Sequence, residues 1–156
     1  TTGEAFAAKI VPTRQFALQR SFCVEDLLQE ARMLRNLSHP AIVKVCDAYN
    51  EVDSFAIVMQ LVEGGDLFDR VIKRGRYPEP DARDTMRHLL SALAYLHALG
   101  IAHRDVKPEN ILLRTLDSDV DVLLTVFGLA NGAAVVEACP SQASSDILSC
   151  VLICGV

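Results

Sequence analysis

One eight-residue stretch of this chain carries side chains that could together transfer a phosphoryl group. It reads His103-Arg104-Asp105-Val106-Lys107-Pro108-Glu109-Asn110. Asp105 could accept the proton of an attacking hydroxyl, and Lys107 could neutralise charge on the phosphoryl group being moved. Asn110 offers an amide oxygen to a magnesium ion. The stretch therefore predicts a phosphoryl-transfer loop, with Asp105, Lys107 and Asn110 as catalytic residues and Asn110 also as a metal ligand.

The stretch resembles the catalytic loop of eukaryotic serine/threonine protein kinases, which reads H-R-D-x-K-P-E-N. A lysine at position 107 is typical of serine/threonine rather than tyrosine kinases. Two further segments, residues 61–69 (LVEGGDLFD) and 95–105 (YLHALGIAHRD), resemble the calcium/calmodulin-dependent group and its checkpoint-kinase relatives. The resemblance covers roughly residues 1–130. It implies transfer of the γ-phosphate of ATP to a hydroxyl of a protein substrate.

Other residues follow the nucleotide-binding pattern of the same family. Ala7-Ala8-Lys9 resembles the strand whose lysine contacts the α- and β-phosphates and pairs with a helix glutamate, here Glu30. Residues 57–65 (IVMQLVEGG) resemble the hinge segment that borders the adenine pocket. The resemblance implies that backbone groups there bond the adenine edge, that two apolar side chains sandwich the ring, and that an acid lies near the ribose and substrate. The implied cofactor-binding residues are Lys9, Glu30, Ala7, Gln60, Val62, Glu109 and Leu112.

Several of these residues also have ordinary structural interpretations. A lysine in a strand often protects a sheet edge, and a lone glutamate on a helix is usually solvated. Glu63, Asp66 and Glu109 could favour basic residues in a peptide substrate, or they could be ordinary solvated acids. His103 lacks a carboxylate or cysteine partner at metal-site spacing. By resemblance it is a packed residue, stacked in a spine with Leu34, Val45 and Phe127.

The chain departs from the family pattern at its magnesium site. Where the family has Asp-Phe-Gly, this chain has Val126-Phe127-Gly128. The aspartate is the main magnesium ligand, and a valine side chain has no oxygen to offer a hard cation. The cofactors predicted are therefore ATP and Mg²⁺ at a weakened site. Two hypotheses stay open: a serine/threonine kinase domain fragment, and an impaired pseudokinase or decayed copy that serves as a nucleotide- or protein-binding scaffold. Val126 itself could also be a sequence error or the mark of a degenerate copy.

Hydrophobic periodicity and turn residues predict a chain that contains both strands and helices. Asp81 is expected to cap the longest helix, and Gly100 to end it. The predicted strands are 5–11, 41–49, 55–61, 111–113 and 120–125, and the predicted helices are 24–37, 67–72 and 82–99. This order predicts an α+β, protein-kinase-like two-lobe fold that is incomplete: a small lobe lacking its first two strands, and the first part of the helical large lobe. We expect one partial domain over residues 1–156, with 1–62 in the small lobe and 63–156 in the hinge exit and large lobe, degenerate after about residue 130.

Composition limits the classes of protein to which this chain could belong. The 156 residues are 51% hydrophobic and 22% charged, with a net charge of −5, which is typical of a globular chain. No basic run is long enough to follow nucleic-acid phosphates. The longest apolar run, residues 147–156, is too short to span a bilayer. Five cysteines without a CxxC motif favour a reducing compartment, the cytoplasm or the nucleus. The expected partners are ATP and a protein substrate or partner, with no nucleic acid and no membrane.

Overall fold

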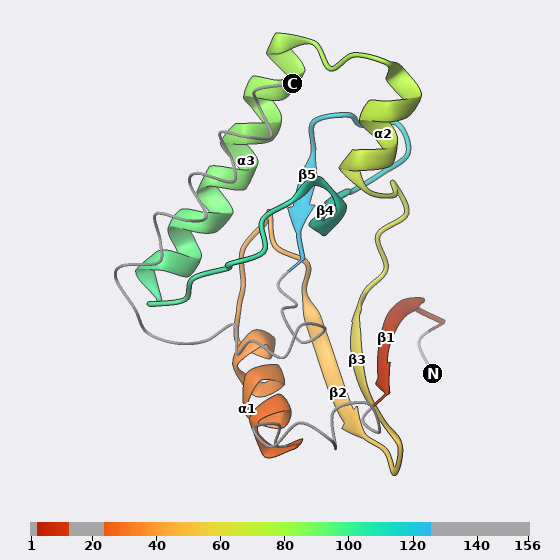
Figure 1. The fold of residues 1–156 in the computed structure, drawn as a ribbon, viewed down its shortest axis with the longest axis vertical. Coiled ribbons are helices and arrows are strands. Elements are labelled where there is room, and N and C mark those ends of the chain that lie inside the picture. The colour runs from red at the N-terminus through yellow and green to blue at the C-terminus, as the bar shows by residue number, and fades with distance from the viewer. Residues whose placement is uncertain (1–2, 13–23, 126–156) are drawn as a thin grey trace.

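The computed structural model describes residues 3–12 and 24–125 (Figure 1). Its helices and strands confirm the predicted α+β class and the predicted order of elements. The three-stranded sheet and α1 lie at one end of the molecule, α2 and α3 lie at the other, and β4 and β5 lie between them. The bounds are Phe6–Pro12 (β1), Val24–Arg35 (α1), Val45–Asn50 (β2), Ser54–Gln60 (β3), Leu67–Arg74 (α2), Glu79–Ala98 (α3), Ile111–Leu113 (β4) and Val122–Leu124 (β5).

The larger sheet is antiparallel, with β3 between β1 and β2. Along β3 the buried residues Phe55, Ile57 and Met59 alternate with half-buried ones, because successive side chains of a strand point to opposite faces. The register places Lys9 of β1 opposite Ile57 and Ala7 opposite Met59. The sheet therefore fixes the predicted phosphate-contacting lysine relative to the hinge segment that continues from β3.

Helix α1 packs against β2 and buries Ala31 and Leu34 in the core (Figure 1). Its last turn is extended by backbone hydrogen bonds that reach Leu37, whose N–H donates to the carbonyl of Leu34 at 3.1 Å. Val45 on the adjoining strand is also buried. Leu34, Val45 and His103 of the predicted spine are thus all core residues, while the fourth member, Phe127, lies outside the described residues.

Helix α3 begins earlier than the sequence predicts. It starts at Glu79 and its N-cap is Pro78, so the prediction that Asp81 is the cap was wrong. The physical reason is Pro80, whose fixed φ suits the first turn of a helix and lets the helix form before Asp81. Asp81 lies in the first turn instead, where its carboxylate pairs with Arg74 at 2.9 Å. Gly100, as predicted, follows the end of the helix and has a positive φ of 75°.

The ribbon of β4 and β5 has backbone partners on both of its outer edges. On the β4 side, Asp66 forms an antiparallel bridge with Leu112. On the β5 side, Ile42 forms a parallel bridge with Leu124, and the N–H of Val43 donates to the carbonyl of Leu124 at 3.0 Å. Residues 41–43 therefore pair with β5 and not with β3, which corrects the predicted strand 41–49: β2 begins only at Val45.

None of the helices within the described ranges is long and apolar enough to cross a membrane.

His39 joins the segment after α1 to helix α3. Its Nδ1 accepts a hydrogen bond from the N–H of Ala41 at 3.1 Å, and its Nε2 lies 3.1 Å from the hydroxyl of Ser91. Its ring stacks on that of Tyr95 with the centroids 5.2 Å apart, and the Tyr95 hydroxyl accepts the N–H of Ser38 at 3.0 Å. Because Nδ1 must accept from a backbone N–H, the ring is neutral with its hydrogen on Nε2.

Protonation of His39 should destabilise the fold. Desolvation lowers the pKa of His39 below the ordinary value of 6.5. As the pH falls past 6.5 the unfolded chain therefore takes up a proton first, and stability declines until the pH reaches the folded pKa, where the loss levels off. We expect the melting temperature to fall more steeply between about pH 8 and pH 5 in the natural chain than in His39→Gln, which cannot titrate. Equal slopes for the two proteins would contradict this account.

Candidate active site

The three predicted catalytic residues meet at one carboxylate oxygen. Asp105 Oδ2 accepts a hydrogen bond from Asn110 Nδ2 at 2.8 Å, and Lys107 Nζ lies 3.0 Å from the same atom. Asn110 Nδ2 also donates to the backbone carbonyl of Asp105 at 2.8 Å. Both of these side-chain contacts use Oδ2, so Oδ1 can face an incoming hydroxyl. The carboxylate is partly exposed, at 33% of its side-chain surface, and is therefore accessible to a substrate.

Asn110 is held by the turn that follows Lys107 and by the residue after β5. Residues Pro108–Asn110 form a 3-10 turn in which the N–H of Asn110 donates to the carbonyl of Lys107 at 2.9 Å. The carbonyl of Asn110 accepts both the N–H of Thr125, at 2.9 Å, and the Thr125 hydroxyl, at 3.1 Å. These bonds fix the position of Asn110, and the side-chain amide of Asn110 in turn orients the carboxylate of Asp105. Sequence reasoning missed Thr125, although its place directly before Val126-Phe127-Gly128 could have indicated it.

His103 ties the same loop to Thr125 from inside the core. The ring is only 3% exposed, its Nε2 donates to the Thr125 carbonyl at 2.7 Å, and its Nδ1 accepts the N–H of Asp105 at 3.3 Å. Both ring nitrogens thus contact backbone groups, which agrees with the structural role predicted for this histidine. Between His103 and Asp105, Arg104 has a φ of 63°, a left-handed conformation that costs a non-glycine residue about 1 kcal/mol or more and often marks functional loops.

The hinge segment leaves specific backbone groups for a ligand. The N–H of Gln60 donates to the carbonyl of Lys44 at 2.9 Å, and its side-chain Oε1 accepts the N–H of Lys44 at the same distance. A backbone contact from Gln60 to adenine would therefore use its carbonyl. Val62 is half-buried and, among the described residues, no backbone hydrogen bond occupies its N–H or carbonyl. Sequence reasoning missed Lys44, which acts through its backbone and so carries no side-chain signal.

β4 is bonded directly to the residues that leave the hinge. The N–H of Gly64 donates to the carbonyl of Leu113 at 3.1 Å, and the N–H of Leu113 donates to the carbonyl of Gly65 at 2.8 Å. We call residues 64–66 the hinge exit. Leu112, bridged to Asp66 and half-buried, is held in register with this segment. The placement suits the predicted contact of Leu112 with one face of an adenine ring.

For the remaining predicted site residues the structure gives a position in the fold, which does not by itself test their roles. Lys9 is half-buried on β1, and Ala7, also half-buried, lies opposite Met59 at the end of β3. Glu30 belongs to α1, but its side chain lies outside what the structure describes, so its pairing with Lys9 stays a prediction. Glu109 is exposed on the 3-10 turn beside Asn110. The roles of these residues in nucleotide binding likewise stay predictions.

The described residues do not by themselves build a magnesium site. Magnesium prefers octahedral oxygen ligands, usually one or two carboxylates with phosphate oxygens and water. Asn110 supplies one amide oxygen, while Asp105 Oδ2 is already shared by Asn110 and Lys107. No group of three or more His, Cys, Asp or Glu side chains suited to a metal occurs in residues 3–12 and 24–125. Val126, at the position of the family's main ligand, lies outside those residues.

A family model described as "Protein kinase domain" matches residues 1–145. The chain belongs to the protein kinase domain family. It is similar to calcium-dependent protein kinase 12 of Arabidopsis thaliana, with 36% identity over 94% of this chain and 29% of the relative. It is also similar to calcium/calmodulin-dependent protein kinase type 1 of Macrobrachium nipponense, with 38% identity over 80% of this chain and 38% of the relative. The resemblance inferred from the catalytic loop is confirmed.

Among solved structures, the kinase chain is similar to Rad53 residues 1–466 in complex with AMP-PNP. The TM-score is 0.72 and the identity 38%, and the match covers 81% of this chain and 32% of the Rad53 chain. The kinase-like fold is therefore shown for the described part. This chain spans well under half the length of these relatives.

Gly64 should not tolerate a side chain. A Cβ at this position would fall inside contact distance of the backbone carbonyl oxygens of Leu113 and Thr115, and backbone cannot move aside cheaply. We expect Gly64→Ala to lower the free energy of unfolding by about 3 kcal/mol or more, the upper range for overpacked sites. Chemical denaturation measures this change.

Gly75→Ala is the matched control for this substitution. Gly75 has a positive φ of 70°, and no atom lies within 4 Å of the position that a Cβ would take, so an alanine there meets backbone strain alone. That strain should cost about 1 kcal/mol. If Gly64→Ala were no more destabilising than Gly75→Ala, the close approach of the hinge exit to β4 would be contradicted.

Proposed function

We propose that this chain is part of a serine/threonine protein kinase domain that binds ATP and is shaped to transfer its γ-phosphate to a hydroxyl of a protein substrate. The observation that carries the proposal is the convergence of Lys107 and Asn110 on the carboxylate of Asp105. A carboxylate that is fixed on one oxygen and open on the other suits a general base for a hydroxyl. Membership of the protein kinase domain family supports the same reaction.

Each predicted residue then has a defined task. The carbonyl of Gln60 and the backbone of Val62 would bond the adenine edge, while Ala7 and Leu112 would hold the ring between them. Lys9, positioned by Glu30, would contact the phosphates. Asp105 would orient the hydroxyl and accept its proton, and Lys107 would offset charge on the moving phosphoryl group. Glu109, exposed beside Asn110, would lie on the ribose and substrate side.

A second candidate function is favoured by Val126. Without the carboxylate at that position the magnesium site is weakened, because Asn110 would be left as its main protein ligand. The chain would then act as a pseudokinase, a nucleotide- or protein-binding scaffold. In either role we propose one partial domain, with residues 1–62 in the small lobe and 63–156 in the hinge exit and large lobe. We also propose a reducing location, the cytoplasm or the nucleus.

Nucleotide binding should survive the weakened metal site. The adenine and Lys9 contacts need no metal, so ATP alone should raise the melting temperature, and magnesium should add little. At ATP concentrations 100-fold above the dissociation constant the stabilisation is about 2.7 kcal/mol. Thermal shift assays with ATP, with and without magnesium, measure this response.

Lys9→Met tests the phosphate contact in the same assay, with Lys44→Met as its control. The side chain of Lys44 is exposed, and its two bonds to Gln60 use only backbone atoms of the lysine, so they persist in the variant. Lys9→Met should reduce the shift caused by ATP, and Lys44→Met should leave it unchanged. A cooperative melt that ATP does not move would rule out the nucleotide site.

Restoring the carboxylate should restore turnover. A missing principal metal ligand costs on the order of 4 kcal/mol of transition-state stabilisation, about 10³-fold in rate. We therefore expect Val126→Asp to raise phosphotransfer to a generic protein substrate by about that factor. The double variant with Asp105→Asn, which lacks the proton acceptor, should lose the gain. If Val126→Asp binds ATP with magnesium and still shows no turnover, the scaffold function replaces the kinase function.

A further inference from the structure

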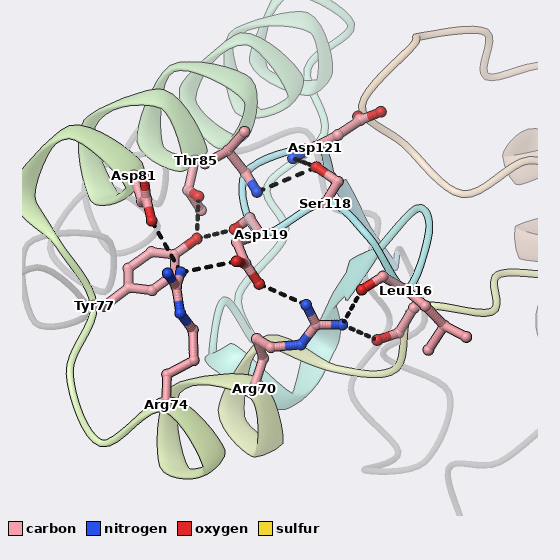
Figure 2. Close-up of polar contacts among 11 residues, drawn as sticks. Arg70, Arg74, Tyr77, Asp81, Thr85, Leu116, Ser118, Asp119 and Asp121 are labelled. Carbon is pink, nitrogen blue, oxygen red and sulfur yellow. Dashed lines mark hydrogen bonds and ion pairs between the residues drawn. The ribbon is translucent and has the colours of Figure 1, made fainter.

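Arg70 of α2 contacts the loop between β4 and β5, which lies 46 to 49 residues further along the sequence (Figure 2), and the hinge exit, which lies six residues before it. Its Nη1 lies 2.5 Å from Asp119 Oδ1 in the loop between β4 and β5. Its Nη2 donates to the carbonyl of Leu116 in the same loop at 3.1 Å and to the carbonyl of Gly64 in the hinge exit at 3.3 Å. The side chain is only 16% exposed. A planar guanidinium can make these bonds at once because its donors are set in a rigid fork.

The hydrogen bond from Arg70 to the Gly64 carbonyl connects α2 to the proposed nucleotide site. The N–H of Gly64 bonds to β4, and the same residue lies two positions after Val62, whose backbone is expected to meet adenine. Arg70 therefore holds the hinge exit through the carbonyl of Gly64, while β4 holds it through the N–H. A shift of the Gly64 peptide would move the backbone of Val62 relative to Leu112, and a ligand site depends on the precise placement of its few polar groups.

Asp119 is itself held in place before it meets Arg70. The hydroxyl of Tyr77 donates to the backbone carbonyl of Asp119 and also lies 2.6 Å from the hydroxyl of Thr85 (Figure 2). The hydroxyl of the preceding Ser118 accepts the N–H of Asp121 at 3.0 Å, which shapes the loop. The loop between β4 and β5 is thus a fixed anchor, and Arg70 transmits its position to the hinge exit.

Arg74, one helical turn further along α2, provides an internal comparison. Its Nη1 pairs with Asp81 Oδ2 and with Asp119 Oδ2, each at 2.9 Å. It carries the same charge as Arg70 and shares its aspartate, yet within the described residues its side-chain bonds go to these two carboxylates and not to the hinge exit. The two arginines therefore separate two effects: stabilisation of the large-lobe part, which both provide, and restraint of the hinge exit, which only Arg70 of this pair provides.

We propose that Arg70 is a positioning residue that sets the hinge backbone for nucleotide binding, with the loop between β4 and β5 as its anchor. The proposal rests on the proposed nucleotide-binding function. It predicts that loss of the Arg70 guanidinium weakens nucleotide affinity by more than the accompanying loss of fold stability would. Binding at the hinge and the packing of the β4–β5 loop are then energetically coupled through one side chain.

The test compares Arg70→Met, Arg74→Met and Arg70→Lys in the 156-residue chain. Calorimetry with ADP measures the dissociation constant of the nucleotide. Magnesium is left out, so the substitution at the magnesium site, Val126, does not affect the result. We expect Arg70→Met to raise this constant about fivefold and Arg74→Met to change it less than about twofold, while both lower the melting temperature. Arg70→Lys can keep the pair with Asp119 but cannot bridge both carbonyls, so it should recover thermal stability without recovering affinity.

Amide hydrogen exchange at residues 62–66 gives a second readout that does not need a ligand. Exchange at Gly64, whose N–H donates to the Leu113 carbonyl, should be faster in Arg70→Met than in Arg74→Met, because only the first releases the hinge exit. Equal effects of the two substitutions on affinity and exchange, or full recovery of affinity in Arg70→Lys, would overturn the proposal. If the natural chain does not bind ADP, the proposed function fails, and the exchange rates alone decide whether Arg70 positions the hinge.

Discussion

Two strands of three residues each, β4 and β5, must satisfy their backbone hydrogen bonds on both outer edges, and the arrangement of the chain depends on this requirement. All three β5 residues are buried, so unpaired backbone groups there would be costly. The hinge exit pairs with β4, and residues 41–43 pair with β5. Residues 41–43 lie between α1 and β2, and the hinge exit follows β3, so these two segments connect the three-stranded sheet to the ribbon. The small ribbon therefore sets the position of the sheet, with Lys9, relative to the loop that carries Asp105.

The ends of the same ribbon also carry the candidate chemistry. Asn110 immediately precedes β4 and Thr125 immediately follows β5, and the bonds between them join the catalytic loop to the residue before Val126. His103 adds a third connection from the core. The side of the site that we propose accepts the proton is therefore built by local, well-satisfied contacts. The metal-binding side depends on position 126, where an apolar side chain stands in place of the family's carboxylate, so the two functions proposed for the chain differ mainly in how much nucleotide chemistry survives that replacement.

The sequence predicts the element types well, and it singles out the loop whose side chains converge on Asp105, because both features rest on local signals. Alternation in β3, the apolar stripe of α3 and the eight-residue motif are read without knowledge of distant contacts. The errors arise where distant partners or competing local rules decide. Residues 41–43 look like a strand of the larger sheet but pair with β5, and Asp81 looks like a helix cap but follows a proline that starts the helix earlier. Arg70 gave no motif signal, because its contact with Gly64 uses a backbone carbonyl and its partners Leu116 and Asp119 are brought near only by the fold.

The central claim is that the hinge segment and β4 together form the adenine site of this chain. A crystal structure with a non-hydrolysable ATP analogue tests it most directly. The account predicts the adenine edge on the carbonyl of Gln60 and the backbone of Val62, with the ring between Ala7 and Leu112 and the phosphates directed toward Lys9. An analogue bound away from the hinge segment, or crystals that take up none at saturating concentration, would contradict the claim.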